Sequence, residues 1–232
     1  AHIIFTNKVV LDKVNLAAAE NLELICEVAT GFNNIDIEYA KERGIAVTNV
    51  AGYSTSTVVQ HTFATALSLM DEVLYYDKFV KSGEYSKCRF FTCLDKPFNE
   101  IEGKTWGIIG LGNIGRRVAK IAEAFGAEVI YYSTSGKNSS TQFKKVSFEE
   151  LLEKSDIISI HAPLNENTKG LINYEALIKM KSSAILVNMG RGPIVVEKDL
   201  ARAIEEEQIR GAALDVYETE PVGEDNILLS IK

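Results

Sequence analysis

The chain has 232 residues and a formal net charge of −7, and 46% of its residues are hydrophobic. That length accommodates one large domain or two small ones. The acidic balance argues against nucleic acid or an anionic membrane as a partner, and no apolar run approaches the roughly 18 residues of a membrane span. Three cysteines form no disulfide framework and no signal peptide is recognisable, so a cytoplasmic location is expected.

The first fifty residues alternate between predicted strands and helices. Strands are expected at 2–6, 22–29 and 45–48, with helices at 15–21 and 36–43 between them. Asp36 is the expected N-cap of the second helix, and Gly44 is its expected C-terminal stop. This βαβαβ order predicts a parallel sheet.

One long helix is expected next, from Ser54 or Thr55 to about Val80. Its apolar residues keep helical spacing; they include Val58, Val59, Ala66, Leu69, Val73 and Leu74. Residues 81–102 are less regular and contain several aromatic side chains. Two interpretations of this stretch stay open, a packed connector and an arm that covers a partner subunit.

The second half of the chain repeats the alternation more clearly. Strands are expected at 106–110, 128–132, 156–160, 184–188 and 211–214, and helices at 114–125, 147–154, 174–179 and 198–207. The strands are apolar throughout, which is typical of a doubly wound parallel sheet covered on both faces. Five strands are recognisable, whereas a complete dinucleotide-binding fold has six.

A glycine fingerprint lies between the first of these strands and its helix. Trp106 to Ile109 leads directly into Gly110-Leu-Gly112-Asn113-Ile114-Gly115. In this pattern the first glycine permits a tight turn, the second lets a pyrophosphate approach the backbone, and the third lets the helix pack closely on the strand. The helix N-terminus adds free N–H donors, so the motif predicts dinucleotide binding.

Ligands of parallel sheets bind at the carboxyl ends of the strands. The second strand ends at Ser133, where an acidic residue would bind the ribose 2′-hydroxyl of NAD. Without that carboxylate, Ser133 and Lys137 could hold a 2′-phosphate, although a serine also bonds a plain ribose. The choice between NAD and NADP therefore stays open.

Three further strand ends carry candidate residues. His161-Ala162-Pro163 follows the third strand, and His161 is read as a hydrogen-bonded loop residue, a cofactor neighbour or a catalytic group. Asn188-Met189 leads to Arg191, which lies between two glycines and suits a carboxylate ligand. Asp215 ends the fifth strand, where a nicotinamide amide could reach it, or it is simply solvated.

Together these segments resemble the D-isomer-specific 2-hydroxyacid dehydrogenase family over nearly the whole chain. The segments that carry the resemblance are 29–36, 44–49, the glycine fingerprint, 161–164, 188–192 and 214–221. The resemblance implies reversible hydride transfer between C2 of a small 2-hydroxy acid and C4 of NAD or NADP. The stretch from Thr30 to Asp36 is most similar to the glycerate, hydroxypyruvate and glyoxylate reductase branch.

The resemblance also assigns roles to residues. Arg191 matches the arginine that binds the substrate carboxylate and 2-oxo oxygen, and Glu220 matches the acid that pairs with the catalytic histidine and raises its pKa. The backbone at Thr30 and Gly31 matches the loop that faces the substrate carboxylate. The residues expected at the cofactor are Gly110, Gly112, Asn113, Ile114, Gly115, Ser133, His161, Ala162, Pro163, Asn188, Met189 and Asp215.

The expected architecture is α/β, a Rossmann-type doubly wound parallel sheet with a smaller flavodoxin-like α/β substrate domain, both truncated at the chain ends. The expected segments are a partial substrate-binding domain (1–52), a linking helix and dimerisation arm (53–103) and a dinucleotide-binding domain (104–232). No metal site is expected. The expected partners are a 2-hydroxy or 2-oxo acid and a second copy of the chain, without nucleic acid or membrane.

Two departures from the family pattern affect the functional interpretation. Ser133 stands where many members carry aspartate. The family's catalytic histidine follows a proline at a point beyond Lys232, and the family's first strand and helix precede Ala1. A fragment of a longer enzyme is therefore expected. The alternatives are a cofactor-binding fragment without the histidine and a dinucleotide-sensing, corepressor-like binding protein.

Overall fold

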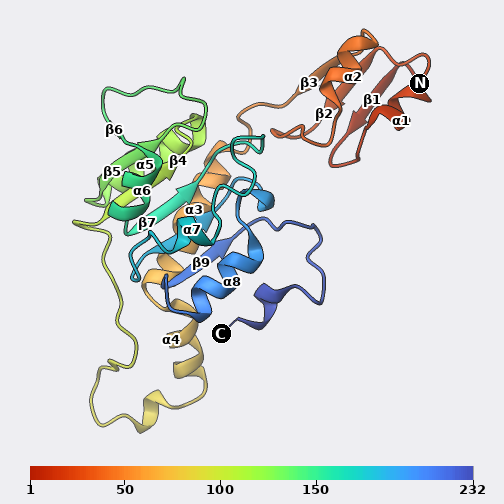
Figure 1. Ribbon diagram of the computed structural model, residues 1–232. Coiled ribbons are helices and arrows are strands. Elements are labelled where there is room, and N and C mark those ends of the chain that lie inside the picture. Colours follow the sequence, from red (N-terminus) through yellow and green to blue (C-terminus); the bar gives the residue numbers. More distant parts are fainter. Residues whose placement is uncertain (232) are drawn as a thin grey trace. The chain divides into compact units, whose positions relative to one another are not determined.

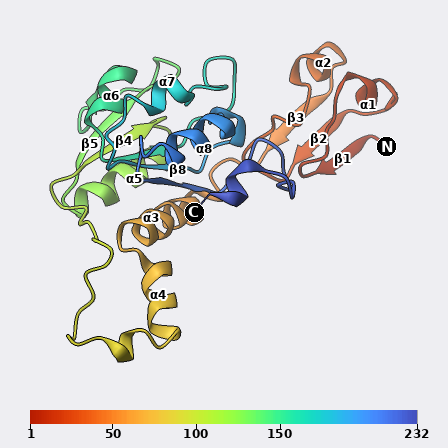
Figure 2. The ribbon, with the colours of Figure 1, turned by 60° about the horizontal axis from the view of Figure 1, so that its bottom comes forward.

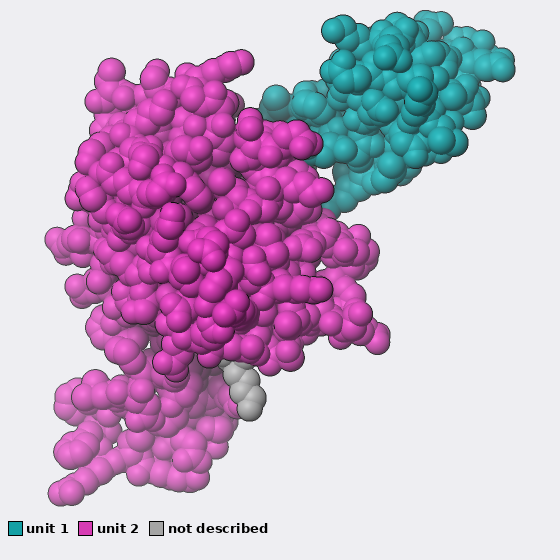
Figure 3. Space-filling model, viewed as in Figure 1, with its two compact units in different colours: residues 1–56 teal, residues 57–232 magenta. Residues whose placement is uncertain are grey.

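The computed structural model describes residues 1–231. The chain divides into two compact units, residues 1–56 and residues 57 onward, shown in teal and magenta in Figure 3. The helix and arm that follow residue 56 belong to the same unit as the second sheet. The functional division at residues 52 and 103 stays a prediction.

The first unit is a three-stranded parallel sheet in the order β1-β2-β3. Its strands are β1 (Ile3–Thr6), β2 (Leu24–Glu27) and β3 (Ala46–Asn49), and its helices are α1 (Lys13–Ala17) and α2 (Ile37–Glu42). Asp36 caps α2 as expected, because its carboxylate accepts a 2.9 Å hydrogen bond from Tyr39 N. Helix α1 begins earlier than predicted, since Asp12 caps it in the same way through Asn15 N.

The second unit contains a six-stranded parallel sheet in the order β6-β5-β4-β7-β8-β9 (Figure 1). Its strands are β4 (Thr105–Ile109), β5 (Glu128–Tyr132), β6 (Lys144–Lys145), β7 (Ile157–Ile160), β8 (Ile185–Asn188) and β9 (Gly211–Leu214). The prediction of five strands was wrong, because β6 is two exposed lysines and carries no hydrophobic pattern. The observed order is that of a complete dinucleotide-binding fold.

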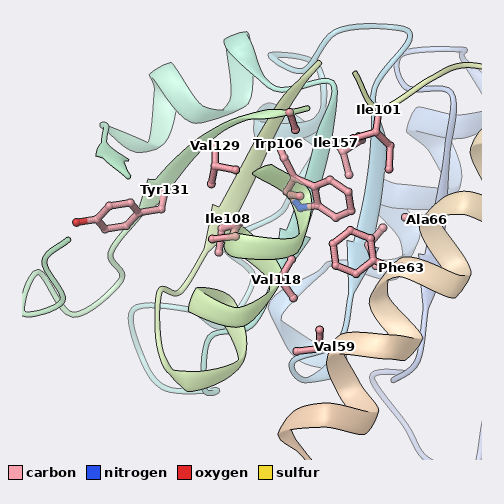
Figure 4. Packing of buried hydrophobic residues seen from close by; sticks show 14 of the residues in the cluster. Val59, Phe63, Ala66, Ile101, Trp106, Ile108, Val118, Val129, Tyr131 and Ile157 are labelled. Carbon is pink, nitrogen blue, oxygen red and sulfur yellow. The ribbon is translucent and has the colours of Figure 1, made fainter. Parts of the chain in front are cut away.

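Alternate residues of each strand point to opposite faces of this sheet, and each face has its own helices. Helices α3 (Thr55–Met70) and α5 (Asn113–Ala124) cover the face that carries Trp106, Ile108 and Tyr131. The opposite face, with Ile109 and Ile158, packs against α6 (Phe148–Lys154), α7 (Tyr174–Leu177) and α8 (Glu197–Glu205). In Figure 4 the ring of Phe63 on α3 faces the indole of Trp106, with ring centroids 4.9 Å apart.

The single helix expected to reach Val80 is two helices, α3 and α4 (Val73–Lys81). Glu72 breaks the helix with a left-handed backbone (φ 53°). Arg210 holds the break, because its Nη2 donates to Leu69 O (3.1 Å) and to Glu72 Oε1 (2.8 Å). Helix α4, the 3₁₀ turn η1 (Tyr85–Lys87) and the following loop, here called the arm (residues 73–99), project away from the sheet in Figures 1 and 2.

Two absences apply to residues 1–231, which the structure describes. No helix there is long and apolar enough to cross a membrane. No group of three or more histidine, cysteine, aspartate or glutamate side chains there could hold a metal ion.

Candidate cofactor and substrate site

The loops that follow β4, β7, β8 and β9 contact one another in series at the carboxyl edge of the sheet. A Cβ atom added to Gly110, after β4, would lie 2.8 Å from Ala162 N, after β7. A Cβ atom added to Gly190, after β8, would lie 2.9 Å from Ala162 O, and one on Gly192 would lie 1.8 Å from Tyr217 O, after β9. These approaches are closer than side chains allow, so the four loops form one continuous edge where parallel sheets bind ligands.

The glycine fingerprint has the geometry that its spacing predicts. Gly110 turns with φ +95°, and a Cβ atom on Gly115 would lie 2.2 Å from Gly110 O, so both positions exclude a side chain. By contrast, a Cβ atom on Gly112 would meet no atom within 4 Å. Helix α5 begins at Asn113 and Ile114 without a side-chain cap. Its free N–H groups and the open space at Gly112 fit a pyrophosphate.

The Arg191 loop is shaped by the buried side chain of Asn188 at the end of β8. Asn188 Oδ1 accepts from Gly190 N (3.0 Å), and Asn188 Nδ2 donates to Arg191 O (3.1 Å). The Arg191 guanidinium donates from Nη1 to Gly190 O at 2.8 Å. Met189 packs its side chain into the core. Asn188 and Met189 therefore present only their main chain to a cofactor in this arrangement.

The loop after β9 is folded on itself and carries Glu220 at its exposed tip. Tyr217 N lies 3.4 Å from the Glu220 carboxylate, to which it donates. Because Gly192 contacts the Tyr217 backbone, the loops that carry Arg191 and Glu220 are neighbours. The sequence could not show that these loops are neighbours, since Arg191 follows one strand, β8, and Glu220 follows another, β9.

Asp215, at the start of the same loop, has a partner that the sequence did not indicate. Its Oδ1 lies 3.3 Å from His61 Nε2 on α3, and each side chain is about half exposed. Its backbone N donates to Asn188 O at 3.1 Å. No sequence motif includes His61, so its contact with Asp215 could be identified only from the structure.

His161, Ala162 and Pro163 follow β7, and the imidazole ring takes part in a buried chain of hydrogen bonds. Trp106 Nε1 donates to Ser159 Oγ (2.8 Å), which lies 3.0 Å from His161 Nε2. An indole N–H can only donate, so the Ser159 hydroxyl accepts from Trp106, and its role toward the imidazole depends on the tautomer of His161. Burial lowers the pKa of His161 to about 3, so the ring is neutral near pH 7.

Ser133, after β5, is buried, and its hydroxyl has no hydrogen-bond partner among the described residues. His161 Nδ1 is also buried without a hydrogen-bond partner within residues 1–231. The two groups follow the strands on either side of β4.

In the first unit, the loop that carries Thr30 and Gly31 is tied to the segment after β3. Thr30 Oγ1 donates to Val50 O and lies 3.3 Å from Ser54 Oγ. Asn49 Nδ2 donates to Thr30 O at 2.7 Å. These bonds fix the backbone that the family resemblance places near a substrate carboxylate.

Comparison with known protein families decides the identity of the chain. The family described as D-isomer specific 2-hydroxyacid dehydrogenase, NAD binding domain, matches residues 63–232. The chain belongs to this family. It is therefore an oxidoreductase that binds a nicotinamide cofactor, and its larger unit has an α/β Rossmann-type fold.

Relatives and solved structures agree with this assignment. The dehydrogenase is 37% identical over 235 residues to a hydroxypyruvate reductase of Blautia hydrogenotrophica, covering 100% of this chain and 73% of the relative. It matches a D-lactate dehydrogenase from Aquifex aeolicus, solved with NAD and lactic acid, with a TM-score of 0.90, 32% identity and coverage of 100% and 72%. An acyclic imino acid reductase solved with NADPH and D-Arg matches with a TM-score of 0.91, 30% identity and the same coverage.

Three of the residues that shape this dehydrogenase's site were missed from the sequence: His61, Glu197 and Glu218. Glu197 and Glu218 exchange hydrogen bonds between α8 and the loop after β9. All three act through partners far away along the chain, so no local pattern could have identified them.

Proposed function

We propose that this dehydrogenase reduces a small 2-oxo acid of the hydroxypyruvate or glyoxylate type to the D-2-hydroxy acid, with NADH or NADPH. The supporting observation is the run of contacts that joins the fingerprint, the Arg191 loop and the Glu220 loop along one edge of a single sheet. Such an edge brings a binding place for pyrophosphate and a guanidinium for the reactant into one crevice.

The chain's own residues divide the work. The N-terminus of α5 and the space at Gly112 hold the pyrophosphate of the cofactor, which supplies the hydride through its nicotinamide ring. The fork of Arg191 binds the substrate carboxylate and polarises the 2-oxo group. The family resemblance assigns the backbone at Thr30 and Gly31 to the loop for the substrate carboxylate.

Glu220 is proposed to act on the proton rather than on the hydride. The family's catalytic histidine donates a proton to the 2-oxo oxygen during reduction, and a nearby anion favours the protonated imidazole. Glu220 lies in an exposed stretch of the loop after β9.

Enzyme assays on the full-length protein test this proposal. We expect loss of NADH or NADPH absorbance on addition of hydroxypyruvate or glyoxylate. Arg191→Ala should lower the rate by about a hundredfold or more, because the reactant loses its orientation, while binding of NADH persists. Arg202→Ala is the matched control, since Arg202 forms an exposed pair with Glu206 at 2.8 Å. Tight binding of NADH without oxidation by any 2-oxo acid would instead support the dinucleotide-sensing alternative.

We further propose that the arm joins two copies of the chain. Helix α4 has no buried residue, and Phe91 and Leu94 are 90% and 84% exposed. A groove of about 810 Å³ on the arm is lined by aromatic and apolar side chains, among them Tyr76, Phe79 and Phe98. Exposed apolar surface of this kind marks a protein interface, and a second identical arm would cover it symmetrically.

Light scattering after size-exclusion chromatography measures this association. The full-length protein should elute as a dimer, and the double variant Phe91→Asp, Leu94→Asp as a folded monomer. A dimer that persists in this variant would place the interface elsewhere. The double variant Lys144→Asp, Lys145→Asp, on exposed β6, is the control and should remain dimeric.

The cytoplasmic location stays a proposal. It is supported by three cysteines, Cys26, Cys88 and Cys93, that are free thiols in the structure. Fractionation of cells that express the natural protein, followed by immunodetection, tests it; recovery outside the cytoplasm would contradict it.

A further inference from the structure

Glu197, the first residue of α8, is a buried glutamate whose residue surface is 8% exposed. Its Oε1 accepts from Glu218 N at 2.7 Å, and its Oε2 accepts from Asn226 Nδ2 at 2.6 Å. In return, Glu197 N donates to Glu218 Oε1 at 3.0 Å. The carboxylate of each glutamate therefore accepts a hydrogen bond from the backbone N–H of the other, and the pair joins the start of α8 to the loop after β9.

These bonds replace the ordinary cap of α8. Val196 occupies the N-cap position and gives no side-chain hydrogen bond. Glu218, from the loop after β9, therefore satisfies a free N–H at the helix start. The two carboxylates also face the positive end of the helix dipole. A buried carboxylate is costly unless it is fully hydrogen-bonded, so Glu197 strongly favours one position of this loop.

The same loop is held from its other side by the Arg191 loop. The backbone of Gly192, next to Arg191, contacts the backbone of Tyr217 so closely that no side chain fits between them. Tyr217 N in turn donates to the Glu220 carboxylate. The β9 loop is thus fixed between the start of α8 and the residue after Arg191.

We propose that Glu197 is a positioning residue for the reaction, which holds Glu220 beside the Arg191 loop through its exchange of hydrogen bonds with Glu218 and Asn226. This inference rests on the proposed function. Glu197 is not itself a catalytic residue, because its two oxygens are engaged by the protein. A residue that only capped α8 would affect stability and leave the proton chemistry unchanged.

Glu197→Gln separates these two roles. The glutamine keeps the size of the side chain and an oxygen that accepts from Glu218 N. Its amide nitrogen faces Asn226 Nδ2, so two donors oppose each other. Asn226 cannot turn over without cost, because its Oδ1 already accepts from Leu228 N at 2.9 Å. The β9 loop must therefore shift.

In the full-length protein, we expect Glu197→Gln to lower kcat for 2-oxo acid reduction roughly tenfold, as a small misplacement does. The KM for the 2-oxo acid, set by Arg191, and the affinity for NADH should stay near the wild-type values. The alkaline limb of the kcat profile should move to lower pH. This direction follows because reduction needs a protonated imidazole, and a displaced Glu220 supports that protonation less.

A double-mutant cycle with Glu220→Gln identifies the path of the effect. If Glu197 acts through Glu220, adding Glu197→Gln to Glu220→Gln should move the pH limb no further. Glu205→Gln is the matched control on the same helix, since Glu205 is exposed, and it should change neither kcat nor the limb. Glu218→Ala is a second test of the same role, for use if Glu197→Gln fails to fold. It removes the exchange of hydrogen bonds without adding a donor, and it should move the alkaline limb in the same direction.

The outcomes separate this inference from the function on which it rests. A wild-type protein that oxidises neither NADH nor NADPH with any 2-oxo acid overturns both. A wild-type protein that is active, with a Glu197→Gln variant whose melting temperature falls but whose pH limb does not move, overturns only the positioning role. The positioning role is also overturned if Glu197→Gln moves the alkaline limb by the same amount in the wild-type background and in the Glu220→Gln background.

Discussion

His61 Nε2 lies 3.3 Å from Asp215 Oδ1, and this contact joins the middle of α3 to the loop after β9. Helix α3 is firmly fixed, because Val59 and Phe63 on its inner face pack into the core of the sheet. The backbone of Asp215 is also held, through its bond to Asn188 O. Asp215 is therefore oriented from two directions at the strand end where we place the nicotinamide amide.

Removal of the histidine should weaken binding of the cofactor. In His61→Leu, Asp215 keeps its backbone bond but loses the group that orients its carboxylate. An exposed polar pair of this kind contributes up to about 1 kcal/mol, so we expect the Kd for NADH to rise by about two- to fivefold. Fluorescence titration with NADH measures this, with Gln60→Leu at an exposed neighbouring position as control. A Kd equal to the wild-type value would show that His61 does not orient Asp215.

Ser133 tests which nucleotide the dehydrogenase prefers. Ser133→Asp places a carboxylate after β5, where it would repel a 2′-phosphate and accept bonds from a plain ribose. We expect kcat/KM for NADPH relative to NADH to fall roughly tenfold or more, a difference of about 1.4 kcal/mol. Ser135→Asp, in the exposed part of the same loop, is the control. An unaltered ratio would mean that residue 133 does not face the ribose.

The sequence predicted the parts of this protein whose physical causes are local. The strands of the large sheet other than β6 are mostly apolar, and the fingerprint glycines directly follow the first of them at the spacing of the motif, so both the fold and the motif were predictable. The two-residue strand β6 was not, because Lys144 and Lys145 are exposed and its place depends on pairing with β5. The break between α3 and α4 depends on Arg210, far along the chain.

The same reasoning applies to the candidate site. Arg191 was identifiable because it lies between two glycines at a strand end. The exchange between Glu197 and Glu218 was not, because a glutamate in the first turn of a helix is ordinarily a solvated residue that favours the dipole. Its burial, and hence its proposed role, follows from the neighbouring loop after β9.

His161 gives the folded protein a dependence on pH. Burial lowers its pKa to about 3, whereas an unfolded histidine titrates near pH 6.5. Between these values the unfolded chain binds the additional proton, so stability falls as the pH falls, by up to about 1.4 kcal/mol per pH unit. His161→Gln should therefore lose less stability than the wild type between pH 7 and pH 5.

Chemical denaturation at the two pH values measures this difference. His2→Gln serves as the control, because His2 is exposed and its replacement should leave the slope unchanged. A slope for His161→Gln equal to that of the wild type would show that the imidazole is not held neutral in the folded protein.

Gly112 and Gly115 provide the sharpest contrast between a glycine that binds and a glycine that packs. At Gly112 an added methyl group meets no protein atom within 4 Å, and the backbone there (φ −83°) suits any residue. Gly112→Ala should therefore keep the wild-type melting temperature and lose NADH affinity by roughly tenfold or more, because the methyl group occupies the approach of the pyrophosphate.

At Gly115 the same methyl group would lie 2.2 Å from Gly110 O, so α5 must move away from β4. Forced overpacking costs about 1–3 kcal/mol or more, and we expect Gly115→Ala to melt at a clearly lower temperature. Calorimetry and NADH titration on both variants separate the two effects. If Gly112→Ala binds NADH as tightly as the wild type, the pyrophosphate does not bind at this turn. This conclusion is direct because the added methyl group meets no protein atom within 4 Å and should not alter folding.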